Sequence, residues 1–230
     1  MQLYGNVEKS IPQKTVLKIV ETIIVILSGW ILFYGGFDRV AGWFGTGPFV
    51  AGDQQRRIIL FGFILITYLR FWVTITVLLQ RRMPWEEVFS VSFAFALYYI
   101  GFSLLGYQNQ LPLAGLDILG IVIFLFGGWL NTVGELKRYR WKKRPENKGK
   151  LYTIGYFRYA MHINYFGDIL WVSGFAILTR NWYSAIIPLW LFSFFIFFNI
   201  PKLDAYLSGK YGKAFVAYRK KTKKLIPFVY

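Results

Sequence analysis

Five polar side chains gather within eleven residues of an otherwise apolar stretch. They are a guanidinium, an imidazole, an amide, a phenol and a carboxylate, supplied by Arg158, His162, Asn164, Tyr165 and Asp168. Buried amides and carboxylates at membrane depth are functional by default, and together these groups could hold a polar ligand. The alternative is local: Asn164 caps a helix, and Asp168, on the same helix face, interacts with the helix dipole.

A run of basic residues precedes this cluster. Residues 137–145 read Lys-Arg-Tyr-Arg-Trp-Lys-Lys-Arg-Pro and form a basic loop. Because Arg and Lys make charge-assisted contacts with phosphate, Lys137, Arg138 and Arg144 are candidates for gripping the phosphates of a nucleotide cofactor. The other interpretation is a juxtamembrane cluster that holds anionic lipid headgroups.

A third constellation lies near the end of the sequence. Asp204, Tyr211 and Tyr218 follow the last apolar block, and the final six residues read Leu-Ile-Pro-Phe-Val-Tyr after several lysines. A solvated basic tail does not need so apolar an end. We therefore expect the tail to fold back onto the membrane domain.

The elements that must position these groups are long apolar helices. Of the 230 residues 56% are hydrophobic, and they form long, nearly uncharged blocks although the net charge is +16. This pattern predicts an all-α fold, a polytopic transmembrane helical bundle of about six spans, with a seventh span within residues 33–50 as an alternative. The expected spans are residues 17–35, 58–79, 88–105, 113–133, 165–178 and 182–200, the last two forming a C-terminal helical hairpin.

The charges predict an orientation for this arrangement. Of the 27 lysine and arginine residues, 22 lie on one side of a six-span arrangement. The opposite side has four: Arg39, Arg56, Arg57 and Arg180. Because lysine and arginine accumulate in cytoplasmic loops, we expect both termini in the cytoplasm, with the chain in a bacterial inner membrane or, in a eukaryote, the endoplasmic reticulum.

Composition also bears on metals and nucleic acid. The sequence has no cysteine and one histidine, so we expect no disulfide and no metal site built from thiolates or clustered histidines. Basic nucleic-acid-binding domains rarely contain this much apolar sequence, so no nucleic-acid partner is expected either.

The two C-terminal polar segments carry a resemblance to a known superfamily. Residues 155–168 resemble the box Gly-x5-Arg-His-Pro-Asn-Tyr-Phe-Gly-Glu of the steroid 5-alpha-reductase C-terminal (DUF1295) membrane reductases and sterol C14 reductases, and residues 200–227 are similar to their closing motif. The isoprenylcysteine carboxyl methyltransferases share the architecture and a shorter form of both boxes. Here Met161 and Ile163 replace the arginine and proline of the box, and Asp168 replaces the glutamate. The intact Asn-Tyr-Phe-Gly run favours the reductases.

The resemblance implies an NADPH-dependent reductase of a carbon–carbon double bond in a lipophilic, steroid-, sterol- or enone-like substrate. An S-adenosylmethionine-dependent methyltransferase of the isoprenylcysteine carboxyl type is the alternative enzyme, and a lipid-binding scaffold without activity is a third. Residues 1–135 would form the substrate side and residues 136–230 a cytoplasm-facing cofactor pocket, within one integral domain. The expected partners are membrane lipids and a lipophilic small molecule, with no obligate protein partner.

The same resemblance implies roles for single residues. Asn164, Tyr165 and Asp168 would hold the nicotinamide–ribose end, the tail residues would close the pocket, and His162 would form a wall. Met161 occupies the position of the box arginine, so Arg158 or the basic loop would replace the phosphate or carboxylate contact of that arginine. The expected cofactor-binding residues are Lys137, Arg138, Arg144, Arg158, His162, Asn164, Tyr165, Asp168, Asp204, Tyr211 and Tyr218.

Such a reduction also needs a proton donor, an acid or a phenol near the substrate. The apolar N-terminal half offers Glu21, Tyr98 and Tyr99, and we take Glu21 and Tyr99 as the candidate catalytic residues. Because an unpaired carboxylate in an apolar span is expensive, Glu21 is expected to have a partner, for which Arg70 is the candidate. A structural salt bridge of Glu21 and packing roles for the tyrosines are the alternatives.

Overall fold

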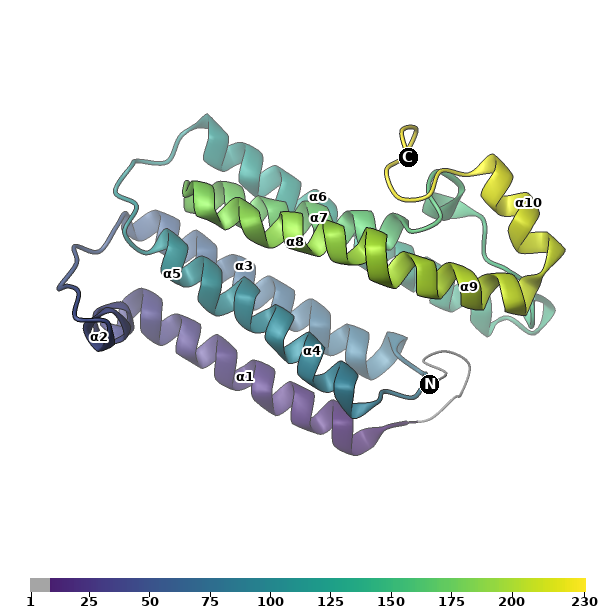
Figure 1. Cartoon of the computed structure of the whole chain (residues 1–230), viewed down its shortest axis with the longest axis horizontal. Coiled ribbons are helices and arrows are strands. Elements are labelled where there is room, and N and C mark those ends of the chain that lie inside the picture. Colours follow the sequence, from purple (N-terminus) through teal and green to yellow (C-terminus); the bar gives the residue numbers. More distant parts are fainter. Residues whose placement is uncertain (1–8) are drawn as a thin grey trace. The chain divides into compact units, whose positions relative to one another are not determined.

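The computed structural model describes residues 9–230, and within this range every secondary-structure element is a helix (Figure 1). The helices are α1 (Ile11–Phe33), α2 (Gly36–Trp43), α3 (Gln54–Val73), α4 (Trp85–Ala96), α5 (Phe102–Gly106), α6 (Gly115–Lys143), α7 (Ile163–Thr179), α8 (Ile186–Phe194), α9 (Ile200–Tyr211) and α10 (Lys213–Lys221). Wider π-helical turns follow α3, α4 and α8, at Thr74–Leu78, Leu97–Gly101 and Phe195–Asn199. The predicted all-α fold is confirmed.

Five helical segments in residues 9–230 are long and apolar enough to cross a membrane: Ile11–Phe33, Gln54–Leu78, Trp85–Gly106, Gly115–Lys143 and Trp182–Tyr211. Each corresponds to a predicted span, so the chain is a multi-pass membrane protein. The other predicted span is α7, an apolar helix of 17 residues, at the short end of what a hydrocarbon core requires.

Two expectations need correction. The alternative of a seventh span in residues 33–50 is wrong, because α2 has only eight residues and rises about 12 Å, far less than a bilayer. The basic stretch that begins at Lys137 is not a loop, since α6 continues as far as Lys143. Lysine and arginine are good helix formers, and their charges are favourable at a helix C-terminus, so the apolar span extends into a basic end.

The chain divides into two compact units, and each is described by itself. Unit 1 contains the described residues up to Phe124 together with Val172–Ile187, and unit 2 contains Leu125–Trp171 and Pro188–Tyr230. The division expected at residue 135, between a substrate half and a cofactor half, is a functional one and stays a prediction.

In unit 1, α1 packs against both α3 and α4 (Figure 1). The core contains stacked aromatic rings. The ring centroids of Phe63 and Phe124 lie 3.7 Å apart at an interplanar angle of 5°, and Phe175 meets both rings edge-on. Here α6 and α7 approach closely, because a Cβ atom on Gly174 would lie only 2.7 Å from the Gly120 carbonyl oxygen.

In unit 2 the same two helices again meet at glycines. A Cβ atom on Gly127 would lie 2.5 Å from the backbone nitrogen of Trp171. The tail also belongs to this unit: the N–H groups of Met161 and His162 donate to the carbonyls of Lys223 and Lys224 at 2.8 and 3.0 Å. The expectation that the tail folds back is therefore confirmed.

Candidate functional site

Asp168 holds the beginning of α7 against α6 within unit 2. Its Oδ1 accepts hydrogen bonds from the Asn131 amide and from the Trp171 indole, both at 2.8 Å. The Asn131 amide also donates to the backbone carbonyl of Asn164 at 3.2 Å. Sequence reasoning missed Asn131 and Trp171, although a lone amide inside an apolar span is a signal that could have found Asn131.

Three of the expected cofactor residues, His162, Tyr165 and Asp204, lie together although they come from two distant parts of the sequence. The buried His162 lies with Nε2 2.9 Å from Asp204 Oδ1, which joins the segment before α7 to α9. The His162 ring stacks on Tyr165, with centroids 5.6 Å apart, and Tyr165 stacks on Phe195 at 4.4 Å. A column of flat rings therefore ends at a carboxylate.

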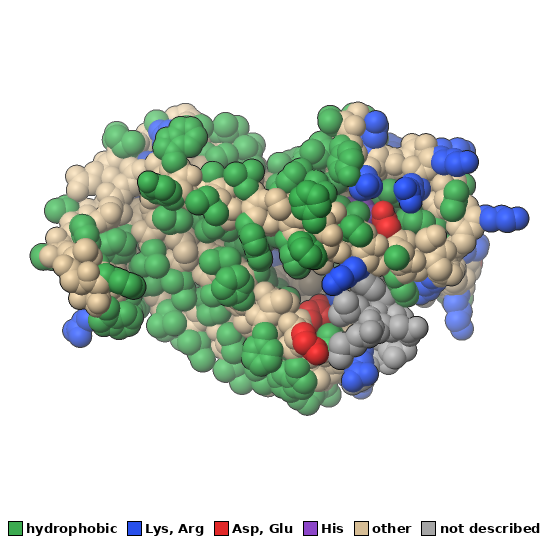
Figure 2. Space-filling view, viewed as in Figure 1, with side chains coloured by type: hydrophobic (Ala, Val, Ile, Leu, Met, Phe, Trp, Pro, Cys, Tyr) green, Lys and Arg blue, Asp and Glu red, His purple; other side chains and the backbone are tan. Residues whose placement is uncertain are grey.

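A hollow of about 730 Å³ lies in unit 2, between the segment around residue 150 and the helices α9 and α10. Its lining residues are Gly149, Lys150, Leu151, Thr153, Lys210, Tyr211, Ala214, Ala217, Tyr218, Lys221 and Thr222. Two of the predicted cofactor residues, Tyr211 and Tyr218, are among them. Three lysines make the wall positive, and Figure 2 shows lysine and arginine side chains gathered over the region of α10 and the end of α9.

Both tyrosines of the hollow are held by neighbours. Lys142 Nζ donates to the Tyr211 hydroxyl at 2.9 Å, and the Tyr218 hydroxyl donates to the Phe157 carbonyl. Burial raises the pKa of the Tyr218 phenol well above its usual value, so the group is neutral and remains a donor at physiological pH.

The other predicted phosphate contacts lie elsewhere in unit 2. Lys137 lies over the Tyr156 ring at 4.5 Å, and Arg138 makes two hydrogen bonds of 2.9 Å to Glu135. Arg158 bonds to the neighbouring tyrosine hydroxyl, and Arg144 is exposed. None of these four lines the hollow, and their roles stay predictions.

Glu21 and Tyr99, in unit 1, are directly bonded to each other. The Tyr99 hydroxyl donates to Glu21 Oε1 at 3.0 Å, and both residues are completely buried. Among the described residues, Glu21 Oε2 has no hydrogen-bond partner. Tyr99 belongs to a π-helical turn, a distortion frequent at functional sites. The pairing expected between Glu21 and Arg70 stays a prediction.

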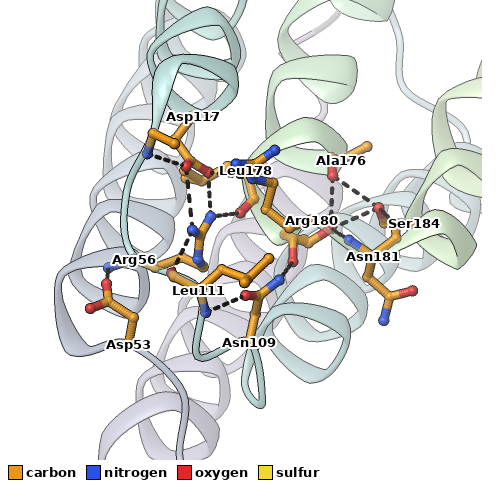
Figure 3. Close-up of polar contacts among 12 residues, drawn as sticks. Asp53, Arg56, Asn109, Leu111, Asp117, Ala176, Leu178, Arg180, Asn181 and Ser184 are labelled. Atoms are coloured by element: carbon orange, nitrogen blue, oxygen red, sulfur yellow. Dashed lines mark hydrogen bonds and ion pairs between the residues drawn. The ribbon is translucent and has the colours of Figure 1, made fainter.

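A buried ion pair at the other end of unit 1 escaped sequence analysis (Figure 3). Arg56 is completely buried, forms a bidentate pair with the equally buried Asp117, and also donates to the carbonyls of Leu178 and Leu111 at 2.7 and 3.0 Å. Arg180 Nε lies 3.4 Å from the same carboxylate. The sequence offered a signal in Asp117, an acid at the edge of an apolar block.

Comparisons with known proteins bear on what these sites do. The sequence pattern of the family described as "Protein of unknown function (DUF1295)" matches residues 72–222, well over half of the chain. The match extends beyond the two C-terminal segments into the apolar helices. The resemblance inferred from the motifs is confirmed.

Three curated proteins are similar to this chain. Steroid 5-alpha-reductase DET2 of Gossypium hirsutum is 26% identical over 194 residues, which cover 77% of this chain and 72% of that protein. DET2 of Arabidopsis thaliana is 33% identical over 116 residues, 49% of this chain and 42% of that one. The probable O-methyltransferase ustE of Ustilaginoidea virens is 35% identical over 92 residues, 40% and 32% respectively. The chain thus aligns with less than half the length of two of the three.

Proposed function

Because the chain belongs to the DUF1295 family and aligns with a plant steroid 5-alpha-reductase over 77% of its length, we propose that it is a membrane reductase. In this proposal it uses NADPH to reduce a carbon–carbon double bond in a lipophilic, enone-like substrate such as a steroid. The observation that carries the proposal is the buried Glu21–Tyr99 pair, with one carboxyl oxygen left without a protein partner among the described residues.

This pair can act on the carbonyl oxygen of an enone. A protonated carboxyl donates one hydrogen bond, and Oε2 is the Glu21 oxygen to which the described residues offer no bond. Tyr99 orients the group through Oε1. A hydrogen bond to the carbonyl oxygen withdraws electrons from the conjugated double bond and stabilises the charge that develops during reduction. The proposal therefore assigns to Glu21 the binding and polarisation of the substrate and the donation of the proton that accompanies the hydride, and to Tyr99 the orientation of the Glu21 carboxyl.

The hollow of unit 2 is suited to the phosphate end of the cofactor. Lys150, Lys210 and Lys221 provide positive charge, and Tyr211 and Tyr218 line the same hollow. When bound, NADPH would supply the hydride for the reduction. We propose that these three lysines hold its phosphates.

The catalytic part of the proposal is tested with purified protein in lipid nanodiscs, NADPH and a steroid enone. Tyr99→Phe should lower kcat by about 100-fold, because the Glu21 carboxyl that polarises the carbonyl group is then no longer oriented, and Glu21→Gln should lower it by at least as much. The NADPH Kd should not change. Tyr98→Phe removes a neighbouring buried hydroxyl and is the matched control. Equal rates in Tyr99→Phe and Tyr98→Phe would overturn the assignment.

The cofactor part has its own test. Replacing Lys210 or Lys221 by Gln should weaken NADPH binding about tenfold, the effect of removing one charge-assisted hydrogen bond, and should reduce the salt dependence of binding. Lys202→Gln, on α9 but outside the hollow, is the control and should have no effect. Calorimetry measures all three variants without any need for a substrate.

A methyltransferase is the second candidate, favoured by the 35% identity to ustE over 92 residues. Titration with S-adenosylmethionine distinguishes the two proposals, because that cofactor carries no phosphate for the lysines of the hollow. Saturable binding of S-adenosylmethionine, unaffected by Lys221→Gln and without NADPH binding, would favour the methyltransferase.

A further inference from the structure

The Arg56–Asp117–Arg180 cluster of unit 1 contains one more positive than negative charge. Two guanidinium groups share one carboxylate (Figure 3). Asp53, another acid labelled in the figure, accepts the backbone N–H of Arg56 at 2.8 Å as a helix cap, and among the described residues it forms no ion pair with either guanidinium. A surplus charge in a poorly hydrated place is costly without a counter-ion, so the cluster calls for an anion.

Arg180 is the member of the cluster that can reach an external anion. Apart from the ion pair of Nε with Asp117, its guanidinium has no ion pair or hydrogen bond among the described residues 9–230, and Nε itself makes no hydrogen bond. The side chain is 19% exposed, whereas that of Arg56 is completely covered. Arg56 therefore neutralises Asp117 inside the protein, and the outer nitrogens of Arg180 remain available to a ligand.

The loop that carries Arg180 is held rigidly. Arg180 adopts a left-handed backbone conformation, φ 54°, which is strained for a residue that has a Cβ atom. Side chains on both sides hold it there: Asn109 donates to the Thr179 carbonyl at 3.1 Å, and Asn181 donates to the Leu105 carbonyl at 3.1 Å. Glycine would fit this backbone without strain, so the guanidinium occupies a conformationally costly position in a preorganised loop.

The surroundings of Arg180 have the character of a membrane interface. Trp182 and Tyr183, two and three residues after Arg180, are among the most exposed aromatic side chains of the described residues. Leu111 and Leu116, in the loop and helix end that contribute to the cluster, also expose apolar surface. Aromatic side chains of this kind concentrate at the level of lipid headgroups. Arg180 is also one of the four basic residues on the side predicted to be poor in positive charge.

We propose that Arg180 binds the phosphate group of an anionic lipid, with Asp117 and Arg56 fixing its position. The guanidinium donates two parallel hydrogen bonds to phosphate oxygens, a geometry that lysine cannot reproduce. The phosphate supplies the missing counter-charge, the acyl chains lie on the apolar surface, and Trp182 and Tyr183 flank the headgroup.

The test compares lipids that differ in headgroup charge. Native mass spectrometry counts lipids retained by the detergent-solubilised protein after incubation with phosphatidylglycerol or phosphatidylcholine. The wild type should retain phosphatidylglycerol preferentially, and Arg180→Gln should weaken that binding about tenfold, the effect of removing one charge-assisted hydrogen bond. Arg39→Gln removes an exposed arginine at the same end of unit 1 and should bind like the wild type.

Two further measurements, on Arg180→Gly and with inorganic phosphate, distinguish lipid binding from misfolding and from binding of free phosphate. Arg180→Gly relieves the left-handed strain, so it is expected to fold and yet to lose the lipid preference. Inorganic phosphate that protects the wild type but not Arg180→Gly against thermal unfolding, without any lipid preference, would assign the site to free phosphate and overturn the lipid. Equal retention of phosphatidylglycerol by the wild type and both Arg180 variants would overturn the site itself.

Discussion

One carboxylate oxygen of Asp168 serves donors from two different helices. The amide of Asn131 comes from α6 and the indole of Trp171 from the next turn of α7, each at 2.8 Å. A motif residue that the resemblance assigns to cofactor binding therefore also has a structural task. Its substitution would affect stability as well as binding, and the two effects must be measured separately.

Replacing Asp168 by Ala should lower the free energy of unfolding by about 3 kcal/mol, because two hydrogen bonds to its carboxylate, from Asn131 and Trp171, are removed. Glu146→Ala removes an exposed acid of the same unit and is the control, with an expected change within about 0.5 kcal/mol. Chemical unfolding in detergent, followed by tryptophan fluorescence, measures both. Equal stability of the two variants would contradict the stabilising role of the Asp168 hydrogen bonds.

The buried pair of Arg56 and Asp117 predicts an asymmetric result. Asp117→Asn should destabilise unit 1 by about 3–5 kcal/mol, because the fully buried guanidinium then lacks its counter-charge. Glu87→Gln, in the partly exposed pair with Arg81, should cost no more than about 1 kcal/mol. Thermal unfolding of the two variants in the same detergent makes the comparison.

At the scale of elements, glycines decide how closely α6 and α7 pack. Gly127 and Gly174 lie where a Cβ atom would meet backbone of the opposite helix at 2.5–2.7 Å, and backbone cannot move aside as a side-chain end can. This close approach brings the α6 amide of Asn131 within reach of Asp168. The Asn131–Asp168 hydrogen bond therefore depends on the close glycine contacts between α6 and α7.

Gly127→Ala should therefore destabilise the protein by about 1–3 kcal/mol, the usual cost of overpacking, although alanine is the better helix former. A Cβ atom added to Gly62 on α3 would have no neighbouring atom within 4 Å, so Gly62→Ala should be neutral or slightly stabilising. The melting temperatures of the two variants, compared with that of the wild type, measure both changes in stability. A stabilised Gly127→Ala would show that α6 and α7 do not pack as described.

For the whole molecule, the predicted orientation puts both termini and the basic segments in the cytoplasm. The sequence has no cysteine, so single cysteines can be introduced as reporters without a background. In intact cells, a membrane-impermeant maleimide should label Thr46→Cys and leave Lys148→Cys unlabelled, because Lys148 belongs to the basic side. Both positions are exposed. The opposite pattern would reverse the topology, and with it the side on which the proposed cofactor pocket lies.

The sequence by itself determined the class of structure and the family. Long uncharged blocks have one stable form in a bilayer, the helix, and the box around Asn164 is contiguous in the chain, so both could be read directly. Sequence reasoning also selected Glu21, Tyr99, His162 and Asp204 individually, because polar groups beside or inside apolar spans are conspicuous. It misjudged where α6 ends, since the basic residues after the apolar block favour a helix as much as a loop.

Only the tertiary structure decided which of these residues meet. Glu21 and Tyr99 are 78 positions apart, and Arg56 and Asp117 are 61 apart. The lysines of the hollow were likewise indistinguishable from the other basic residues until α9 and α10 were placed beside residue 150. Local spacing carries no information about such pairs, because they depend on which helix faces pack and on the glycines that let α6 and α7 approach.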